Sequence, residues 1–138
     1  MVDRVSETLQ ISAAGLRAQS SRMRVIAENV ANAESTARTP EENPYQRQIP
    51  VFESEFDRQV GTELVRMNDV ALDESDFRMV YEPGHPAADG EGYVKYPNVS
   101  SLVELMDMRD AQRSYEANLT MVEGTRRMLE RTLDLLRR

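Results

Sequence analysis

The 138-residue chain contains no cysteine and no tryptophan, and aromatic residues make up only 6% of it. Without cysteine, disulfide bonds and thiolate chemistry are excluded, although the compartment is not fixed by this absence. A large apolar ligand pocket is not expected from so few aromatic side chains. The sequence has no run of eighteen apolar residues, so it predicts no membrane-spanning helix. It also lacks a basic stretch followed by an apolar one near its start, and we therefore expect no Sec-type signal peptide.

Groups that carry out chemistry are equally scarce. His85 is the only histidine, and prolines on both sides favour a place in a loop over a role as catalytic base. Asp73, Glu74 and Asp76 lack the ligand spacing and glycine of a calcium loop, so a solvated turn is the better interpretation. The glycines between residues 84 and 92 are not followed by Lys-Ser/Thr, which excludes a phosphate-binding loop. We therefore predict no enzyme and assign no catalytic, cofactor-binding or metal-binding residue.

Acidic residues outnumber basic ones, and the formal net charge is -7. The surplus lies in the middle of the chain, because residues 34–100 hold 14 acidic and 6 basic side chains. Residues 1–33 hold three acids and four arginines, and residues 101–138 hold seven of each. Nucleic acid is not expected as a partner, because phosphate binding requires a basic surface. The acidic middle suits exposure to solvent.

What the sequence does contain is an unbroken seven-residue apolar repeat at each end. Near the N-terminus the repeat and its interleaved positions comprise Val2, Leu9, Leu16, Met23 and Val30 with Val5 and Ile26. Near the C-terminus they comprise Met108, Tyr115, Val122, Leu129 and Leu136 with Leu105, Leu119 and Leu133. This spacing keeps a narrow apolar stripe on one side of a helix, as in coiled coils.

The repeats predict helices over about 4–32 and from 101 to the C-terminus. Gly15 costs roughly 1 kcal/mol relative to alanine inside a helix, which indicates either a tight contact or a tolerated weakness. The segment 29–32, with its two asparagines, is expected to end the first helix. Pro97 precedes the second helix, and Ser101 with Glu104 matches a capping box, in which each side chain bonds the other residue's backbone amide.

Loops and short strands are expected between the helices. Residues 64–67, 77–81 and 92–97 show the alternating polarity of strands, whereas 49–56 fits a strand or a short helix. We predict that these strands form one small sheet, marginal unless the helices or a partner cover it. The fold class is then α+β, mainly α, with two long terminal helices paired as an antiparallel coiled coil and a small β-rich middle lobe with loops. Its domains are 1–33 with 101–138, the paired helices, and 34–100, the β/loop middle.

Two antiparallel helices can cover only one face of each other. Further apolar residues lie off the repeat: Ile11, Val25, Leu102, Val103, Met106 and Leu135. Surplus apolar surface of this kind indicates self-assembly or hetero-assembly. Two alternatives remain from the residues alone. Besides a self-assembling subunit, the residues fit a monomeric hairpin that covers its surplus with the small sheet, and a coiled-coil adaptor that binds a single helical partner.

Several segments resemble the flagellar axial proteins of bacteria, and the later ones resemble the proximal rod members in particular. The matching segments are ISAAGLRAQ (11–19), RMRVIAENVANA (22–33), YEPGHPAAD (81–89), GYVKYPNV (92–99), RSYEAN (113–118) and MLERTL (128–133). The resemblance covers roughly residues 9–36 and 44–136. It departs at 36–45, a longer acidic loop where many axial proteins carry a Thr-Pro-Gly-Tyr turn.

The resemblance implies a structural subunit of the flagellar basal-body rod, the drive shaft around the export channel. It implies as partners other copies of the chain, neighbouring rod proteins, the adaptor between the rod and the export gate or MS ring, and the flagellar export apparatus. Export then uses the flagellar type III system and places the protein in the periplasm-spanning rod, with no cofactor, nucleic acid or small-molecule substrate. The residues predicted to form the assembly interface are Leu9, Leu16, Met23, Ile26, Val30, Leu105, Met108, Tyr115, Leu119, Val122, Leu129, Leu133 and Leu136.

Overall fold

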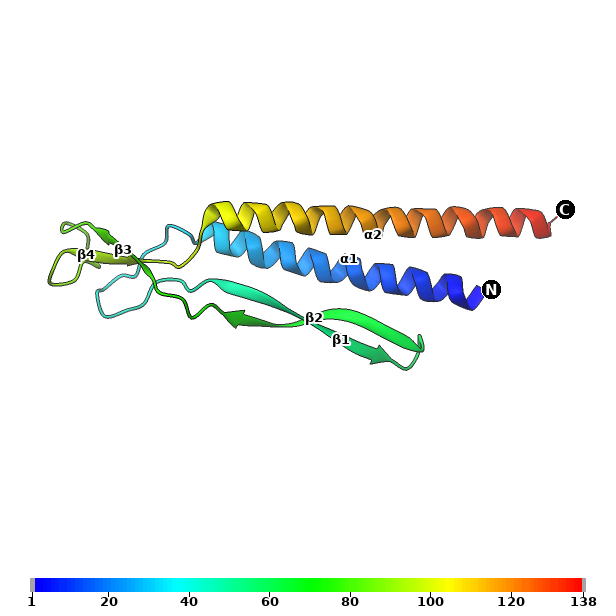
Figure 1. The fold of residues 1–138 in the computed structure, drawn as a ribbon, viewed down its shortest axis with the longest axis horizontal. Coiled ribbons are helices and arrows are strands. Elements are labelled where there is room, and N and C mark those ends of the chain that lie inside the picture. The colour runs from blue at the N-terminus through cyan, green and yellow to red at the C-terminus, as the bar shows by residue number, and fades with distance from the viewer. Residues whose placement is uncertain (1, 138) are drawn as a thin grey trace. The chain divides into compact units, whose positions relative to one another are not determined.

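The computed structural model describes residues 2–137, with side chains from Arg4 onward. Its elements are α1 (Val2–Ala31), β1 (Gln48–Asp57), β2 (Thr62–Leu72), β3 (Arg78–Tyr81), β4 (Tyr93–Tyr96) and α2 (Ser101–Leu136) (Figure 1). The fold is therefore α+β and mainly α, with a long helix toward each end and a β-rich middle, as the sequence predicts. The predicted domain limits at residues 1 and 138, and the side chain of Val2, lie outside the described residues.

The chain forms two compact units, and each unit contains a part of both helices. The first unit comprises residues 2–23, 51–69 and 109–137, and the second comprises 24–50 and 70–108. Both helices are continuous across these limits, since α1 and α2 each run without a break. The grouping of 1–33 with 101–138 into one domain and of 34–100 into another remains a prediction.

Within the first unit, α1 and α2 pair antiparallel at small residues. A Cβ atom added at Gly15 would lie 2.8 Å from the side-chain amide of Asn118, so the two backbones approach closely at this point. Further along α1, Leu16 and Ser20 line the same depression as Tyr115, which precedes Asn118 in α2. Small side chains are buried on both helices of this unit: Ser12, Ala14, Ala18, Ala111 and Thr125. Gly15 therefore marks a tight helix contact.

The strands form two separate two-stranded sheets within residues 2–137, and the prediction of one small sheet is wrong. The segment 49–56, for which the sequence fits either a strand or a short helix, belongs to β1. It is long enough to pair with β2 alone, across a turn in which Gly61 has a φ of +76°. β3 and β4 pair with each other, with Tyr81 opposite Tyr93. The long turn between these short strands keeps their pairing local.

The β3–β4 sheet has one covered and one open face, as alternation along a strand requires. Val94 is fully buried and its partner Val80 is half-buried, whereas Tyr81 and Tyr93 are exposed and meet edge to face with 5.3 Å between ring centres. In the connecting turn the Ala87 amide donates to Nδ1 of His85 at 3.0 Å, so the ring belongs to the turn.

Two further expectations about the helices need correction. The Ser101–Glu104 capping box does not form, because the Glu104 carboxylate instead accepts hydrogen bonds from Asn29 and Arg47. Glu104 is only 1% exposed, so its side chain points into the second unit and away from the start of its own helix. Val25, assigned to the surplus apolar surface, is also 1% exposed and belongs to the core.

Candidate assembly surface and a buried polar cluster

The thirteen residues predicted for the assembly interface differ widely in burial. Ile26 is fully buried, and seven are half-buried: Leu9, Leu16, Met23, Met108, Tyr115, Val122 and Leu129. Five are exposed: Val30, Leu105, Leu119, Leu133 and Leu136. The structure brings Leu16 and Tyr115 together at one depression between the helices of the first unit. The most buried positions of α2 are Glu104, Ala111 and Thr125, which lie one turn before members of the apolar repeat.

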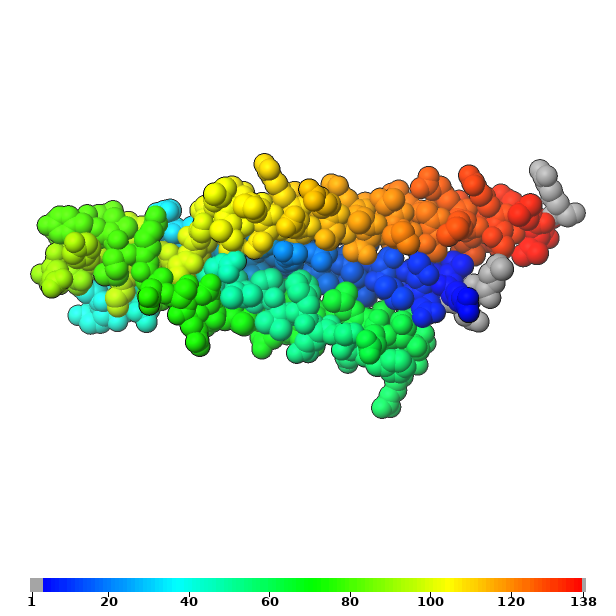
Figure 2. All heavy atoms as spheres, viewed as in Figure 1, coloured from blue at the N-terminus to red at the C-terminus, as the bar shows by residue number. Residues whose placement is uncertain are grey.

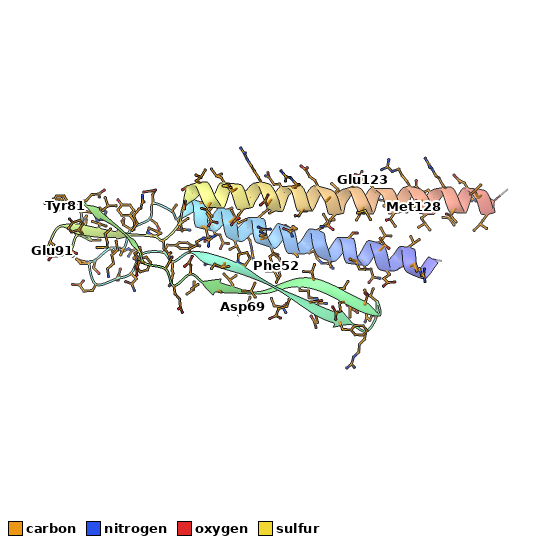
Figure 3. All side chains as sticks on the ribbon, in the orientation of Figure 1. Phe52, Asp69, Tyr81, Glu91, Glu123 and Met128 are labelled. Carbon is orange, nitrogen blue, oxygen red and sulfur yellow. The ribbon has the colours of Figure 1, made fainter. Side chains whose placement is uncertain are left out.

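Large apolar side chains remain exposed along α2. Besides the repeat, they include Leu102, Val103, Met106, Met121, Met128 and Leu135, with exposures from 46% to 74%. Figure 2 shows that, in this view, no other segment covers the outer side of the part of α2 in the first unit, mainly orange to red. Figure 3 labels Met128 on α2 and Phe52 on β1, a further exposed apolar residue. Apolar surface on this scale is typical of a protein–protein contact. We define the exposed apolar residues of α2 as the α2 apolar face.

A buried polar cluster in the second unit was not predicted from the sequence. Its centre is Asn29, which is 1% exposed although its side chain is polar. The amide of Asn29 pairs with the backbone of Gln48 in both senses: its Nδ2 donates to the carbonyl at 2.8 Å, and its Oδ1 accepts from the N–H at 2.9 Å. The Tyr45 hydroxyl donates to the same Oδ1 at 2.8 Å, and Nδ2 donates to the Glu104 carboxylate at 3.1 Å.

Arg47 connects this amide network to charged groups. Its Nε donates to Glu104 Oε1 at 2.6 Å, and its terminal nitrogens lie 3.4 Å from Asp73 and 3.5 Å from Asp107. Its backbone N–H donates to Asn98 Oδ1 at 2.8 Å, and its carbonyl accepts from the Asp73 N–H at 2.8 Å. The buried Glu104 charge is therefore both paired and hydrogen-bonded, as burial requires. We define Asn29, Tyr45, Arg47, Gln48, Asp73, Asn98 and Glu104 as the polar cluster.

The cluster also changes the acidity of its members. Burial, together with the nearby Glu28 and Glu104 carboxylates, raises the pKa of the Tyr45 phenol. Tyr45 therefore stays protonated at neutral pH and keeps its hydrogen bond to Asn29. The backbone amide and hydroxyl of Ser75, and then Arg47, lower the pKa of Asp73. Asp73 is thus a bonded member of the cluster, and the solvated-turn interpretation fits only its exposed neighbours Glu74 and Asp76.

Two sequence signals, taken together, could have indicated this cluster. Asn29 lies between apolar positions of a helix, but its place near the helix end suggested a terminal role. In α2, Glu104 begins a seven-residue repeat that continues with Ala111, Asn118 and Thr125. These residues form the stripe of the helix that packs inward. A carboxylate on a buried stripe requires a cationic partner, and Arg47 is far away in the sequence.

The described residues show neither a metal site nor a spanning helix. Within 2–137 no group of three or more histidine, aspartate or glutamate side chains could hold a metal ion. No helix in the same range is long and apolar enough to cross a membrane. Long paired helices, a β-rich middle and an open apolar helix face define instead a structural subunit that packs against other subunits.

Comparison with known proteins identifies the kind of subunit. The family model described as the C-terminal region of flagellar basal body rod proteins FlgE, FlgF and FlgG matches residues 91–135. The chain is 46% identical over 136 residues to the flagellar basal-body rod protein FlgC of Agrobacterium fabrum, covering 99% of this chain and 98% of that protein. It is 38% identical over 125 residues to FlgC of Escherichia coli O6:H1, covering 91% and 92% of the two chains. FlgC of Bacillus subtilis is 35% identical over 144 residues, covering 93% of this chain and 95% of its own. The chain therefore belongs to the FlgC family of flagellar basal-body rod proteins and is a structural component of the rod.

Proposed function

We propose that the chain assembles into the proximal rod by packing its terminal helices against those of other copies and of neighbouring rod proteins. The α2 apolar face is the observation that supports this most directly. Leu102, Met106, Met128 and Leu133 are each more than half exposed in the single chain. Burying a large apolar side chain contributes roughly 1.5–3 kcal/mol, so burial of several such residues stabilises an interface strongly. The rod then forms a drive shaft around the export channel.

In this proposal the two terminal segments, 1–33 and 101–138, act as one assembly domain, and the middle, 34–100, lies outside. The charge distribution supports this division, because the surplus of acidic side chains is confined to 34–100. Near-neutral helices suit close packing, and an acidic middle suits water. The protein acts without a cofactor and catalyses no reaction. It reaches the rod through the flagellar type III system without a Sec signal, and its neighbours include the adaptor to the export gate and MS ring.

A charge on the α2 apolar face tests the proposal. Leu133 is 52% exposed, so Leu133→Asp leaves the single chain folded but places an unpaired charge in the expected interface. We expect the variant to be exported and to fail in rod assembly and swimming when it replaces the natural chain. Thr120→Asp introduces the same charge at an exposed polar position of α2, where the residues at the same heptad position in the first unit, Arg113, Arg127 and Asp134, are already charged, and should swim normally.

Substitutions in the half-buried repeat extend this test. Leu16→Asp and Leu129→Asp should likewise block rod assembly and motility while secretion continues. Normal swimming by Leu133→Asp and by either of these variants would contradict the proposal. An adaptor that binds one helical partner is the second candidate, but membership of a rod family gives it no support.

A further inference from the structure

The apolar repeats of α1 and α2 do not by themselves fix how the helices align. Leu9, Leu16 and Met23 follow one another at seven-residue intervals in α1, as do Met108 and Tyr115 in α2. If one helix slips along the other by seven residues, apolar side chains again lie opposite apolar side chains. A repeat of this kind is compatible with several registers, and a single buried polar residue is a known way to select one.

The polar cluster provides a feature that does not repeat. Glu104 is 1% exposed, and the positions one and two heptads later in α2 are Ala111 and Asn118, neither of which carries a charge. The equivalent position before Asn29 in α1 is Arg22. Only one alignment therefore places the amide of Asn29 next to a carboxylate.

A slipped register would leave buried polar groups without partners. Asn29 now lies 3.1 Å from Glu104. A slip in one direction places the methyl group of Ala111 opposite Asn29, and a slip in the other places Asn29 beyond Ser101, the first residue of α2. Arg47 cannot compensate, because the adjacent Gln48 is held to Asn29 through both its N–H and its carbonyl. The cost of an unpaired buried charge then opposes the slip.

We propose that Asn29, Arg47 and Glu104 are the register-determining residues of the helix pair. The apolar repeat supplies the attraction between the helices, and these three residues select the alignment. Arg47 lies outside both helices, so docking of the segment 45–48 is part of the selection. Register selection takes place within one chain and does not depend on the proposed rod assembly.

Engineered disulfides can measure the register directly, because the natural chain has no cysteine to interfere. Gly15→Cys is combined in three separate proteins with Asn118→Cys, Ala111→Cys or Thr125→Cys. The first pair reports the observed register, where a Cβ at position 15 lies 2.8 Å from the Asn118 amide, and the other two report slips of one heptad. The purified full chains are oxidised at low concentration, and intramolecular disulfides are quantified on non-reducing gels. We expect the 15–118 pair to form at least about tenfold more than either other pair, because an unpaired buried charge costs at least that factor.

The same three pairs are then placed in a chain with Asn29→Leu, Arg47→Met and Glu104→Leu. Replacing a buried polar network by apolar residues of similar size often preserves stability, so we expect retained helix content by circular dichroism but a preference reduced to roughly threefold or less. A matched control carries Arg24→Met, Asp110→Leu and Glu116→Leu at exposed helix positions and should keep the original preference.

Each result decides for or against the inference. Absence of the 15–118 disulfide in the chain with the intact cluster, or equal formation of the slipped pairs there, overturns it. So does an undiminished preference in a folded triple variant. If the triple variant loses its helix content, Glu104→Gln alone is decisive: reduced preference at unchanged helix content supports the inference, and unchanged preference overturns it.

Discussion

At residue 92 the backbone has a φ of +88°, a left-handed conformation that side chains with a Cβ rarely adopt. A Cβ at this position would also lie 2.9 Å from the Tyr81 ring and 3.1 Å from Pro83. Gly92 closes the turn in which its carbonyl accepts from the Glu82 N–H at 2.9 Å. The glycine therefore fixes both the chain direction and the position of the exposed Tyr81.

Gly92→Ala is expected to destabilise the fold by about 1–3 kcal/mol, because it combines backbone strain with a steric overlap. The free energy of unfolding in urea measures the effect. Gly84→Ala is the matched control in the same turn, since its Cβ would meet no atom within 4 Å. Equal stability of the two variants would show that residue 92 does not require glycine.

The acidity of Asp73 gives a second prediction for a single residue. Its pKa is lowered in the folded state by the Ser75 amide and hydroxyl and by Arg47, relative to about 3.9 in an unfolded chain. The contribution of Asp73 to stability is therefore present above the unfolded value and is lost as the pH falls through the folded pKa. Asp73→Asn should lower the urea midpoint at pH 7 and make the decline of stability in acid less steep. Glu74→Gln, at an exposed neighbour, should leave that pH dependence unchanged.

Among the larger elements, the helices are the part of the fold that the sequence predicts best. Their apolar periodicity is local information, and it places both helices within a few residues of their observed limits. The residues through which the two helices contact each other are less predictable. The helices meet closely at Gly15, Ala111 and Asn118, and the larger repeat residues lie beside this stripe or outside it. Small side chains permit close backbone approach, and a search for large apolar residues overlooks them.

The two glycines within the helices allow the effect of a tight helix–helix contact to be compared with the effect of helix propensity alone. Gly124→Ala should stabilise the chain by about 0.5–1 kcal/mol, because alanine favours helix and the new Cβ meets no atom within 4 Å. Gly15→Ala should bring no such gain. Its Cβ displaces the Asn118 amide, which donates to the Ser114 carbonyl at 3.0 Å. Thermal unfolding of both variants measures the difference, and an equal gain at both positions would rule out a tight contact at Gly15.

The polar cluster was not predicted, for a different reason. Three of its residues have a local interpretation that is complete in itself: Asn29 as a helix terminus, Glu104 as a cap and Asp73 as a turn. Their actual partners are distant in sequence, and tertiary packing selects them. The strands illustrate the same limit, since their residues indicated pairing but not the division into two sheets.

For the whole molecule, the apolar surface that the single chain leaves exposed decides how the protein associates. A rod subunit on its own should associate as its concentration rises, because the α2 apolar face then finds partners. An adaptor should instead remain a monomer or dimer of constant mass with protected helices. We expect a mass that increases with concentration in sedimentation, and early cleavage within the terminal helices in limited proteolysis. Intact ends and a constant mass would favour the adaptor, and Leu133→Asp should reduce the association.

The polar cluster also has a consequence for the time at which the chain can fold. Its central hydrogen bond joins residues 75 positions apart, Asn29 and Glu104, and Arg47 and Asp73 lie between them in the sequence. Contacts so distant form late, because most of the chain must be free before they can close. In a chain that emerges N-terminus first from a narrow passage, Asn29 meets Tyr45 and Gln48 early, but its carboxylate partner Glu104 follows only much later. The cluster that joins the two helices is therefore incomplete until three quarters of the protein has arrived.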